Sequence, residues 1–250
     1  MNDDERFRKR ITELANLAFS RGIVMFSDFL DLNQQNILRQ VRWSALGVSP
    51  ETAGGYPSAE RKMAAFVPRD IAYEWSFPLV CLQIEPLSEK FSEELSHRDY
   101  LGSVLATGIE RNVIGDILVR DHCAQLFAEE HIADFLIQEL IRVRKTPVRL
   151  FSVESPDDIF EPATEEKTGS VASVRLDSVL ALAFGGSRAE MNQRIRDGRV
   201  FVNARLVTSN GHPLHEGDLI SVRQTGKCRF DKVLHTSKKG RLIIQVSRFI

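Results

Sequence analysis

The chain has 250 residues, of which 43% are hydrophobic and 27% are charged, as is usual for a folded globular protein. At this length, two or three small domains are the default expectation. No apolar run approaches the roughly 20 residues that a membrane-spanning helix requires, so membrane insertion is not expected. The formal net charge of −1 also excludes a protein that is basic throughout its length.

Several classes of protein and site lack their sequence signals. The first ten residues, MNDDERFRKR, are charged and lack the apolar core of a secretory signal, which predicts a cytoplasmic protein. Cys81, Cys123 and Cys228 form no CxxC pair, so neither a disulfide framework nor a metal site is expected. Dinucleotide-binding, P-loop and HExxH motifs are absent. We therefore expect no cofactor and no catalytic residues.

The charge is divided unevenly along the chain. Residues 171–250 contain 14 Lys and Arg against 6 Asp and Glu, a net charge of +8, whereas residues 1–170 have a net charge of −9. A basic surface of this density attracts phosphates and releases their counterions, so the last third is expected to bind a polyanion. The alternative is that the basic tail docks on the acidic front of the same chain.

Two segments near the N-terminus, residues 5–20 and 33–46, have apolar residues at helical spacing. Ser58 begins a further short helical turn. The run AGGYP at 53–57 has the composition of a loop. We therefore predict a mainly helical domain over residues 1–77.

The pattern changes at residue 78, where a short apolar run with strand character begins. The segments read in order as strand 78–87, helix 96–108, strands 113–120 and 124–130, helix 131–143 and strand 146–153. The order β-α-β-β-α-β defines the split βαβ, or ferredoxin-like, arrangement. This predicts a ferredoxin-like domain over 78–155. Proteins with this fold have many different functions, so the fold alone does not indicate the function.

Residues 156–170 combine prolines, acids and small polar residues without periodicity, which predicts a linker. The remaining segments read as helices 173–184 and 187–198, a short strand pair turning at Asn203-Ala204, a strand at 217–224, and a C-terminal hairpin formed by 230–236 and 241–249. The prediction for residues 171–250 is a small α+β module, so the whole chain is of the α+β class.

Specific residues carry a resemblance to known families. Arg175-Leu176-Asp177, Ser187-Arg188, Gly198, VFVN at 200–203, and Gly217-Asp218 with Ile220 resemble the S4 RNA-binding domain in residue type and order. The family usually has Gly where this chain has Ala204. The stretches GGYPSAERK at 54–62 and HRDYLGSVLATGIERNVIGDILV at 97–119 resemble the YlmH family, also called photosystem II S4 domain proteins.

The resemblance implies a small N-terminal domain, an RRM-like middle domain and a C-terminal S4 domain. It also implies a non-enzymatic RNA-binding protein whose partner is rRNA or tRNA on the large ribosomal subunit. The roles implied are ribosome-associated quality control, cell division or photosystem assembly.

Helix 187–198 would present most of the binding surface. On an ideal helix Met191 and Ile195 form the buried stripe, with Arg188, Asn192 and Arg196 within an arc of about 80° beside it. Arginine forks match phosphate oxygens and stack on unpaired bases, which suits structured RNA. The candidate RNA-binding residues are Arg175, Ser187, Arg188, Asn192, Arg194, Arg196, Arg199, Asn203 and Arg205.

In the middle domain the resemblance draws attention to Arg98 and Arg111 as possible secondary RNA contacts. An RRM normally exposes aromatic residues on its central strands for base stacking. Here those strands contain only Phe127, which argues against RNA binding of that type on the sheet. A structural or ribosome-facing role of this domain is the alternative.

Two alternatives remain open. The triplet Arg175-Leu176-Asp177 also occurs around the catalytic aspartate of pseudouridine synthases, which would make the chain an RNA-modifying enzyme with an S4 module. A helix-start signature is the competing interpretation of this triplet. The second alternative is a protein-interaction adaptor whose basic tail binds an acidic partner or an anionic membrane.

Overall fold

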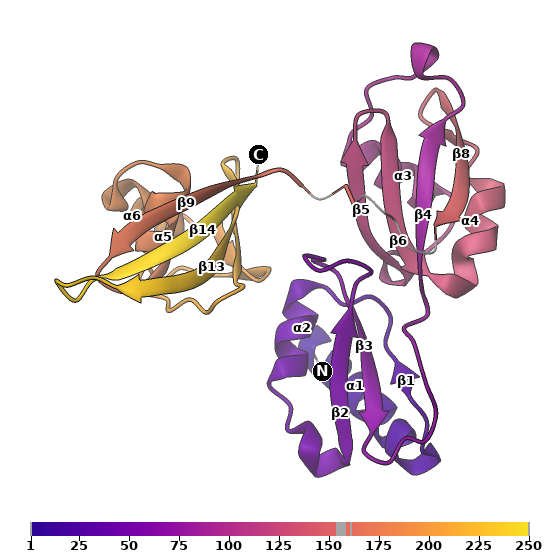
Figure 1. The fold of residues 1–250 in the computed structure, drawn as a ribbon, viewed down its shortest axis with the longest axis horizontal. Coiled ribbons are helices and arrows are strands. Elements are labelled where there is room, and N and C mark those ends of the chain that lie inside the picture. Colours follow the sequence, from indigo (N-terminus) through magenta and orange to yellow (C-terminus); the bar gives the residue numbers. More distant parts are fainter. Residues whose placement is uncertain (1, 154–158, 161, 250) are drawn as a thin grey trace. The chain divides into compact units, whose positions relative to one another are not determined.

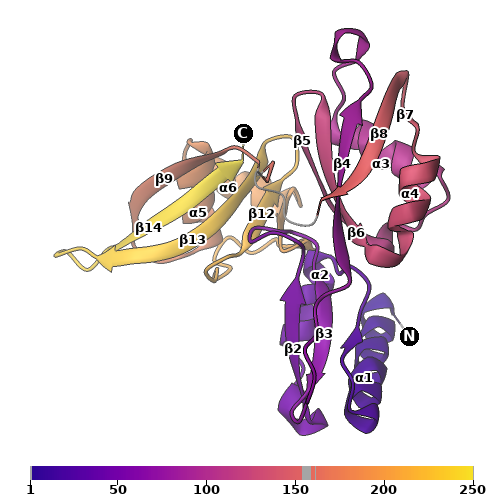
Figure 2. The same ribbon diagram turned by 45° about the vertical axis from the view of Figure 1, so that its right-hand side comes forward.

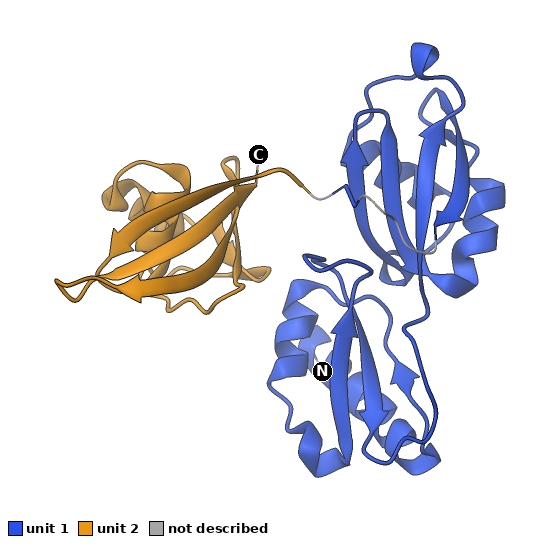
Figure 3. Ribbon diagram, in the orientation of Figure 1, with its two compact units in different colours: residues 1–161 blue, residues 162–250 orange. Residues whose placement is uncertain are grey.

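The computed structural model describes residues 2–153, 159–160 and 162–249. The chain divides into two compact units, residues 1–161 and 162–250, coloured separately in Figure 3. Each unit has a hydrophobic core of its own. No helix in these described ranges combines the length and the apolar character needed to cross a membrane.

The N-terminal part of unit 1 packs helices against a three-stranded antiparallel sheet (Figure 1). Its elements are α1 (Asp3–Arg21), β1 (Met25–Phe26), α2 (Leu32–Arg39), the 3-10 helix η1 (Trp43–Leu46), β2 (Val48–Ala53) and β3 (Met63–Pro68), in the strand order β1-β3-β2. A capping box between Asn2 and Glu5 starts α1. The buried face of α1, which includes Ile11, shares a core with Phe66 of β3.

The structure adds this sheet to the mainly helical region that the sequence predicts. Strand β2 is largely polar and all six residues of β3 are buried, so neither gives the apolar-polar alternation of a half-buried strand. Ser58 lies in the loop 54–62 and not in a helical turn. The predicted helix 33–46 also divides into α2 and η1, because regular helix ends after Arg39.

The second part of unit 1 has the predicted ferredoxin-like order. Its elements are β4 (Leu79–Pro86), η2 (Glu89–Phe91), α3 (His97–Ala106), η3 (Arg111–Val113), β5 (Ile114–Arg120), β6 (Cys123–Glu129), η4 (Glu130–Ile132), α4 (Ala133–Glu139), β7 (Arg142–Val143) and β8 (Thr146–Val153). The sheet order is β5-β6-β4-β8-β7, with every pair antiparallel. Figure 2 shows α3 and α4 on one face of the sheet, where Tyr100, Val104 and Leu136 share a core.

Strand β7 replaces the last part of the predicted helix 131–143. The helix ends at Glu139, and Arg144 adopts a left-handed backbone with φ of +51°. This tight turn lets Val143 pair with Thr146 and enter the core. Strand pairing across a short turn therefore overrides the helical spacing of the apolar residues.

Unit 2 packs two helices against a six-stranded sheet. Its elements are β9 (Thr164–Val171), α5 (Leu176–Phe184), α6 (Arg188–Arg196), β10 (Val200–Val202), β11 (Arg205–Leu206), β12 (Leu219–Val222), β13 (Gly226–Thr236) and β14 (Leu242–Phe249), in the strand order β11-β10-β12-β13-β14-β9. The apolar faces of α5 and α6, including Val179 and Ile195, bury against Val200, Ile220 and Ile244.

Strand β9 corrects the predicted linker 156–170. Residues 164–171 pair with β14 along its whole length, from Thr164 with Phe249 to Val171 with Leu242. The strand is mostly polar because it lies at the edge of the sheet with much of its surface exposed, which removes the hydrophobic signal. The part of the predicted linker at 156–158 and 161 lies outside the described residues.

Candidate nucleic-acid interface

Two adjacent helices position four of the predicted arginines of unit 2, namely Arg175, Arg188, Arg194 and Arg196. Arg175 immediately precedes α5, and Ser187 caps α6 by accepting a hydrogen bond from the Glu190 backbone N–H at 3.2 Å. Gly185 and Gly186, both with positive φ, reverse the chain between the two helices. The side chain of Arg188, the first residue of α6, reaches Asp177 in the first turn of α5.

A buried carboxylate holds two of the arginines. Asp177 is only 1% exposed, and its Oδ2 accepts hydrogen bonds from Nη2 of Arg188 at 2.6 Å and from Nε at 3.2 Å. Arg175 forms an ion pair with Oδ1 at 3.5 Å. The two arginine side chains nevertheless remain 55% and 41% exposed. Asp177 therefore orients two guanidinium groups that still face the solvent.

The same contacts weigh against Asp177 as a catalytic group. Its carboxylate is buried and occupied by two arginines and by the hydroxyl of Ser178, which donates to Oδ1 at 3.3 Å. A catalytic carboxylate must come within hydrogen-bond reach of its substrate. The geometry thus gives the Arg175-Leu176-Asp177 triplet a structural use at the start of a helix.

The remaining polar groups of α6 divide between surface and interior. Arg196 is exposed, and its Nε donates to the Asn192 carbonyl at 3.3 Å. Oδ1 of Asn192 is buried and has no hydrogen-bond partner among the described residues. Asn192 therefore lies at the edge of the surface, with one side of its amide turned inward.

Arg194 and Asn203 form side-chain hydrogen bonds within unit 2. Arg194 donates to Glu190 at 3.0 Å and to the Thr225 hydroxyl, which ties α6 to the turn after β12. The Asn203 amide donates to Asp218 at 2.8 Å and accepts from the Leu219 backbone at 3.0 Å. These contacts give both side chains structural roles beyond the RNA contact predicted from the sequence.

Arg223, which is not among the residues predicted from the sequence, lies beside Arg199. Val200 pairs with Val222 across β10 and β12, and the Arg223 backbone N–H donates to the Arg199 carbonyl at 2.9 Å. Both side chains are exposed, as is Arg205. The sequence does place a basic residue near the end of the predicted strand 217–224. Local spacing, however, does not reveal which strand pairs with it and therefore which arginine lies beside it.

The two secondary candidates of the middle domain differ in accessibility. Arg98 is exposed on the first turn of α3. The guanidinium of Arg111 donates from Nη1 to the carbonyls of Ile114 at 2.5 Å and Gly115 at 3.0 Å. Burial, together with the positive charge of Arg61, lowers the pKa of Arg111 to about 10. Arg111 is therefore a structural residue, and a surface contact by its guanidinium would require these bonds to break.

The loop 54–62 covers part of the middle sheet face that is opposite to α3 and α4. The ring of Tyr56 stacks on Phe127 of β6 with centroids 5.0 Å apart, and its hydroxyl donates to Asp116 of β5 at 2.8 Å. The backbone N–H groups of Glu60 and Arg61 also donate to Asp116, at 2.7 and 3.2 Å. Phe127, the aromatic residue that the sequence suggests for base stacking, is therefore already stacked within the chain.

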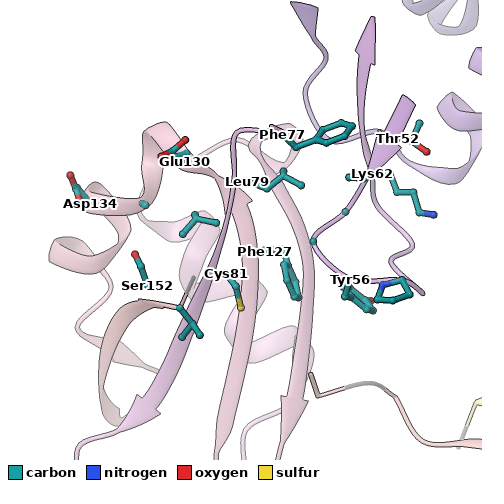
Figure 4. A pocket seen from close by; sticks show the side chains of 17 residues that line it. Thr52, Tyr56, Lys62, Phe77, Leu79, Cys81, Phe127, Glu130, Asp134 and Ser152 are labelled. Carbon is teal, nitrogen blue, oxygen red and sulfur yellow. The ribbon is translucent and has the colours of Figure 1, made fainter. Parts of the chain in front are cut away.

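Beside this loop lies a cavity of about 890 Å³, shown in Figure 4. Its floor contains Phe77, Leu79 and Cys81, and burial raises the pKa of the Cys81 thiol to about 11. Glu130 and Asp134 supply carboxylates on one side and Lys62 lies on the other. Carboxylates repel phosphate, so unit 2 is the better candidate for binding RNA. Within the described ranges, no group of three or more His, Cys, Asp or Glu residues could hold a metal ion.

The fold and the arginine surface define a class, an α+β protein in which a ferredoxin-like domain precedes a small nucleic-acid-binding module. Comparisons with known proteins agree. Residues 73–157 match the family model described as the putative RNA-binding domain in YlmH, and residues 174–220 match the S4 domain. Over 248 residues the chain is 30% identical to the ribosome-associated protein quality control protein P2 of Bacillus subtilis (strain 168), covering 98% of this chain and 95% of that protein. The chain belongs to the YlmH family.

Two further similarities concern parts of the chain. The cell division protein ylmH from Streptococcus pneumoniae has a solved structure that matches with a TM-score of 0.52 and 25% identity, covering 64% of this chain and 96% of that one. The small ribosomal subunit protein uS4 of Acidithiobacillus ferrooxidans is 40% identical over 55 residues, which is 22% of this chain and 26% of that protein. The second similarity is therefore local.

Proposed function

We propose that this chain is a non-enzymatic protein that binds structured RNA of the large ribosomal subunit, either rRNA or tRNA held there, through unit 2. The observation that carries the proposal is the arginine surface around α5 and α6. Arg175 and Arg188 are held by Asp177 and remain partly exposed. Arg196 and Arg199 are exposed at the other end of α6.

The arrangement suits phosphate for a physical reason. An arginine fork can bind two phosphate oxygens at once, and a fork already held by a buried carboxylate loses less side-chain entropy on binding. Arg188 and Arg196 lie eight residues apart on a helix that rises about 1.5 Å per residue, so their backbones are roughly 12 Å apart. The surface can therefore reach more than one phosphate of a folded RNA.

The relatives support the cellular setting. The name of the Bacillus subtilis relative places that protein in ribosome-associated quality control, and the name of the Streptococcus pneumoniae protein places it in cell division. We infer a ribosome-associated role for this chain, with quality control as the first process to test. A catalytic role for Asp177 has less support because its carboxylate is buried and ion-paired.

The test is co-sedimentation of the full chain with purified large and small ribosomal subunits, repeated over a range of salt concentrations. We expect binding to the large subunit with affinity that falls steeply as salt rises. The double variant Arg196→Ala with Arg199→Ala should bind about tenfold more weakly. Its log-log salt slope should be smaller by roughly 1.5, because two phosphate contacts are lost.

The matched control is Arg10→Ala with Arg21→Ala, which removes the same charge from exposed positions of α1 in unit 1. This control should bind as the wild type does. Equal binding by the Arg196 and Arg199 double variant would contradict the proposal, as would binding that is insensitive to salt. Association that survives nuclease digestion of the RNA would instead favour the adaptor alternative.

A further inference from the structure

A second cavity, of about 440 Å³, lies in unit 2 where the end of α6 meets the turn after β12. It is lined by Asp197, Gly198, Arg199, Arg223 and Gln224. Arg223 and Gln224 lie beyond residue 220, where the S4 match ends. The volume falls within the range of about 300–1,000 Å³ that is usual for small-ligand sites.

One wall of this cavity contains Arg223, whose guanidinium lies against an aromatic ring. The guanidinium carbon of Arg223 lies over the ring of Phe201 on β10, 5.0 Å from its centroid. Phe201 is half-buried, whereas Arg223 is exposed. A guanidinium supported by an aromatic ring on one side presents a flat surface on the other, and such a surface stacks on unpaired bases.

The cavity is held in place by contacts on both of its sides. The Arg223 backbone N–H donates to the Arg199 carbonyl at 2.9 Å, which fixes the two arginines next to each other. The turn after β12 closes with a bond from the Thr225 N–H to the Val222 carbonyl at 3.0 Å. Arg194 then ties Thr225 to α6. A preorganised site of this kind loses less entropy when a ligand binds.

The carboxylate of Asp197 favours a ligand that can donate a hydrogen bond. Its Oδ1 accepts a hydrogen bond from Gln193 at 2.8 Å, so the carboxylate is oriented within the helix end that lines the cavity. A carboxylate opposes a bare phosphate, but it accepts hydrogen bonds from the amino groups of cytosine, adenine or guanine. Uracil has no amino group and can donate only from its ring N3–H, so it offers the carboxylate fewer hydrogen bonds. The wall therefore combines a stacking surface with an acceptor for an amino-bearing base.

We propose that this cavity binds one unpaired, amino-bearing nucleobase of the bound RNA, stacked on Arg223 and hydrogen-bonded to Asp197, with the adjoining phosphate on Arg199. The inference rests on the proposed function, since it presumes that unit 2 binds RNA. It adds that the bound RNA must present an unpaired base to this cavity. It also adds that adenine, cytosine or guanine is preferred over uracil at that position.

The experiment uses the full chain and an 11-nucleotide oligouridine RNA with a single central 2-aminopurine, a fluorescent amino-bearing base whose emission changes when it stacks. Wild-type protein should change the fluorescence on binding. Arg223→Lys keeps the charge but removes the planar surface, so it should bind about tenfold more weakly and abolish the fluorescence change. Its salt slope should stay the same, because the number of phosphate contacts is unchanged.

The structure offers a matched control for this change. Arg248 lies over the ring of Phe184 at 5.6 Å, so Arg248→Lys makes the same substitution in another arginine–phenylalanine pair of unit 2, outside the cavity. This variant should bind and report as the wild type does. A second variant, Asp197→Asn, keeps the size of the side chain and should reduce the preference for oligoadenosine over oligouridine several-fold.

The outcomes separate this inference from the proposed function. If the full chain binds ribosomal subunits but Arg223→Lys matches the wild type in affinity and fluorescence, the cavity is not a base site and the proposed function stands. A wild-type complex without a fluorescence change has the same meaning. If the full chain binds neither subunits nor oligonucleotides, both proposals are overturned.

Discussion

In unit 2, single arginine residues of the same helix have different structural roles. Arg188 and Arg194 lie on the same helix, and helical geometry places them on opposite flanks of its buried stripe. Arg188 bonds a buried carboxylate and stays 55% exposed, whereas Arg194 is 30% exposed and connects α6 to Thr225. The difference arises from which acceptors the neighbouring elements place within reach. Only the structure therefore separates a surface arginine from one that stabilises a turn.

The turn between β10 and β11 gives a prediction at this scale. Asn203 and Ala204 have φ of +48° and +63°, a left-handed conformation that costs residues with a Cβ atom roughly 1–2 kcal/mol each. Ala204 is exposed, so glycine should fit without loss of packing. We expect Ala204→Gly to stabilise unit 2 by about 0.5–1 kcal/mol, after the greater chain entropy of glycine is allowed for. Hydrogen exchange at the amides of Val202 and Val207 would measure this.

The neighbouring substitution serves as the comparison. Asn203→Gly relieves the same backbone conformation, but it removes the side-chain bonds to Asp218 and to the Leu219 backbone. We expect it to destabilise unit 2 by about 1 kcal/mol. Faster exchange in Ala204→Gly than in the wild type would show that the left-handed turn carries no strain.

At the scale of elements, the loop 54–62 determines what the middle sheet can do. Its residues follow β2 of the N-terminal part, and they place Tyr56 on Phe127 and two backbone N–H groups on Asp116. This contact joins the two parts of unit 1 through a shared cluster that includes Phe29, Met63 and Phe127. In many RRM domains the corresponding sheet face binds RNA, whereas in this chain loop 54–62 covers part of that face.

Substitutions of two glycines test whether the contact of loop 54–62 with Phe127 stabilises unit 1. A Cβ atom at Gly55 would lie 2.2 Å from the Phe127 ring, and its φ is +90°, so Gly55→Ala should destabilise unit 1 by about 2–4 kcal/mol. Gly102 lies within α3 with nothing within 4 Å of its Cβ position. Gly102→Ala should stabilise the helix by roughly 1 kcal/mol.

Urea unfolding followed by tryptophan fluorescence measures both variants, because Trp43 and Trp75 are the two tryptophans of the chain and both lie in unit 1. The urea midpoint should fall for Gly55→Ala and rise for Gly102→Ala. An unchanged or raised midpoint for Gly55→Ala would show that the close approach of loop 54–62 to Phe127 is not important for stability.

At the scale of the whole molecule, charge follows the two units. Residues 1–161 have a net charge of −8 and residues 162–250 a net charge of +7. Net charge alone therefore disfavours phosphate at unit 1 and favours it at unit 2, although residues 73–157 of unit 1 match a putative RNA-binding domain. Joining the acidic unit to the basic one removes the net positive charge of unit 2 from the full chain, so we expect weaker non-specific RNA binding by the full chain than by unit 2 alone.

This division predicts a difference between the full chain and the fragment 162–250. The fragment should bind unrelated RNA, such as total tRNA, several-fold more tightly than the full chain at about 50 mM salt. The difference should shrink towards about 300 mM, because screening shortens the range of the repulsion. Filter binding of both proteins over this range measures the effect. A constant ratio at all salt concentrations would indicate that unit 1 affects RNA binding by contact and not through its charge.

The sequence by itself determined the class of fold, the order of elements in the middle domain, the S4 resemblance and the basic character of the C-terminal third, because these depend on local spacing, composition and motif order. The tertiary structure alone decided the rest. It revealed β9 as an edge strand, the small sheet of the N-terminal part, the burial of Asp177 and the pairing of Arg199 with Arg223. Each of these depends on contacts between residues far apart in the chain, and the energy of such contacts leaves no periodic trace in either segment.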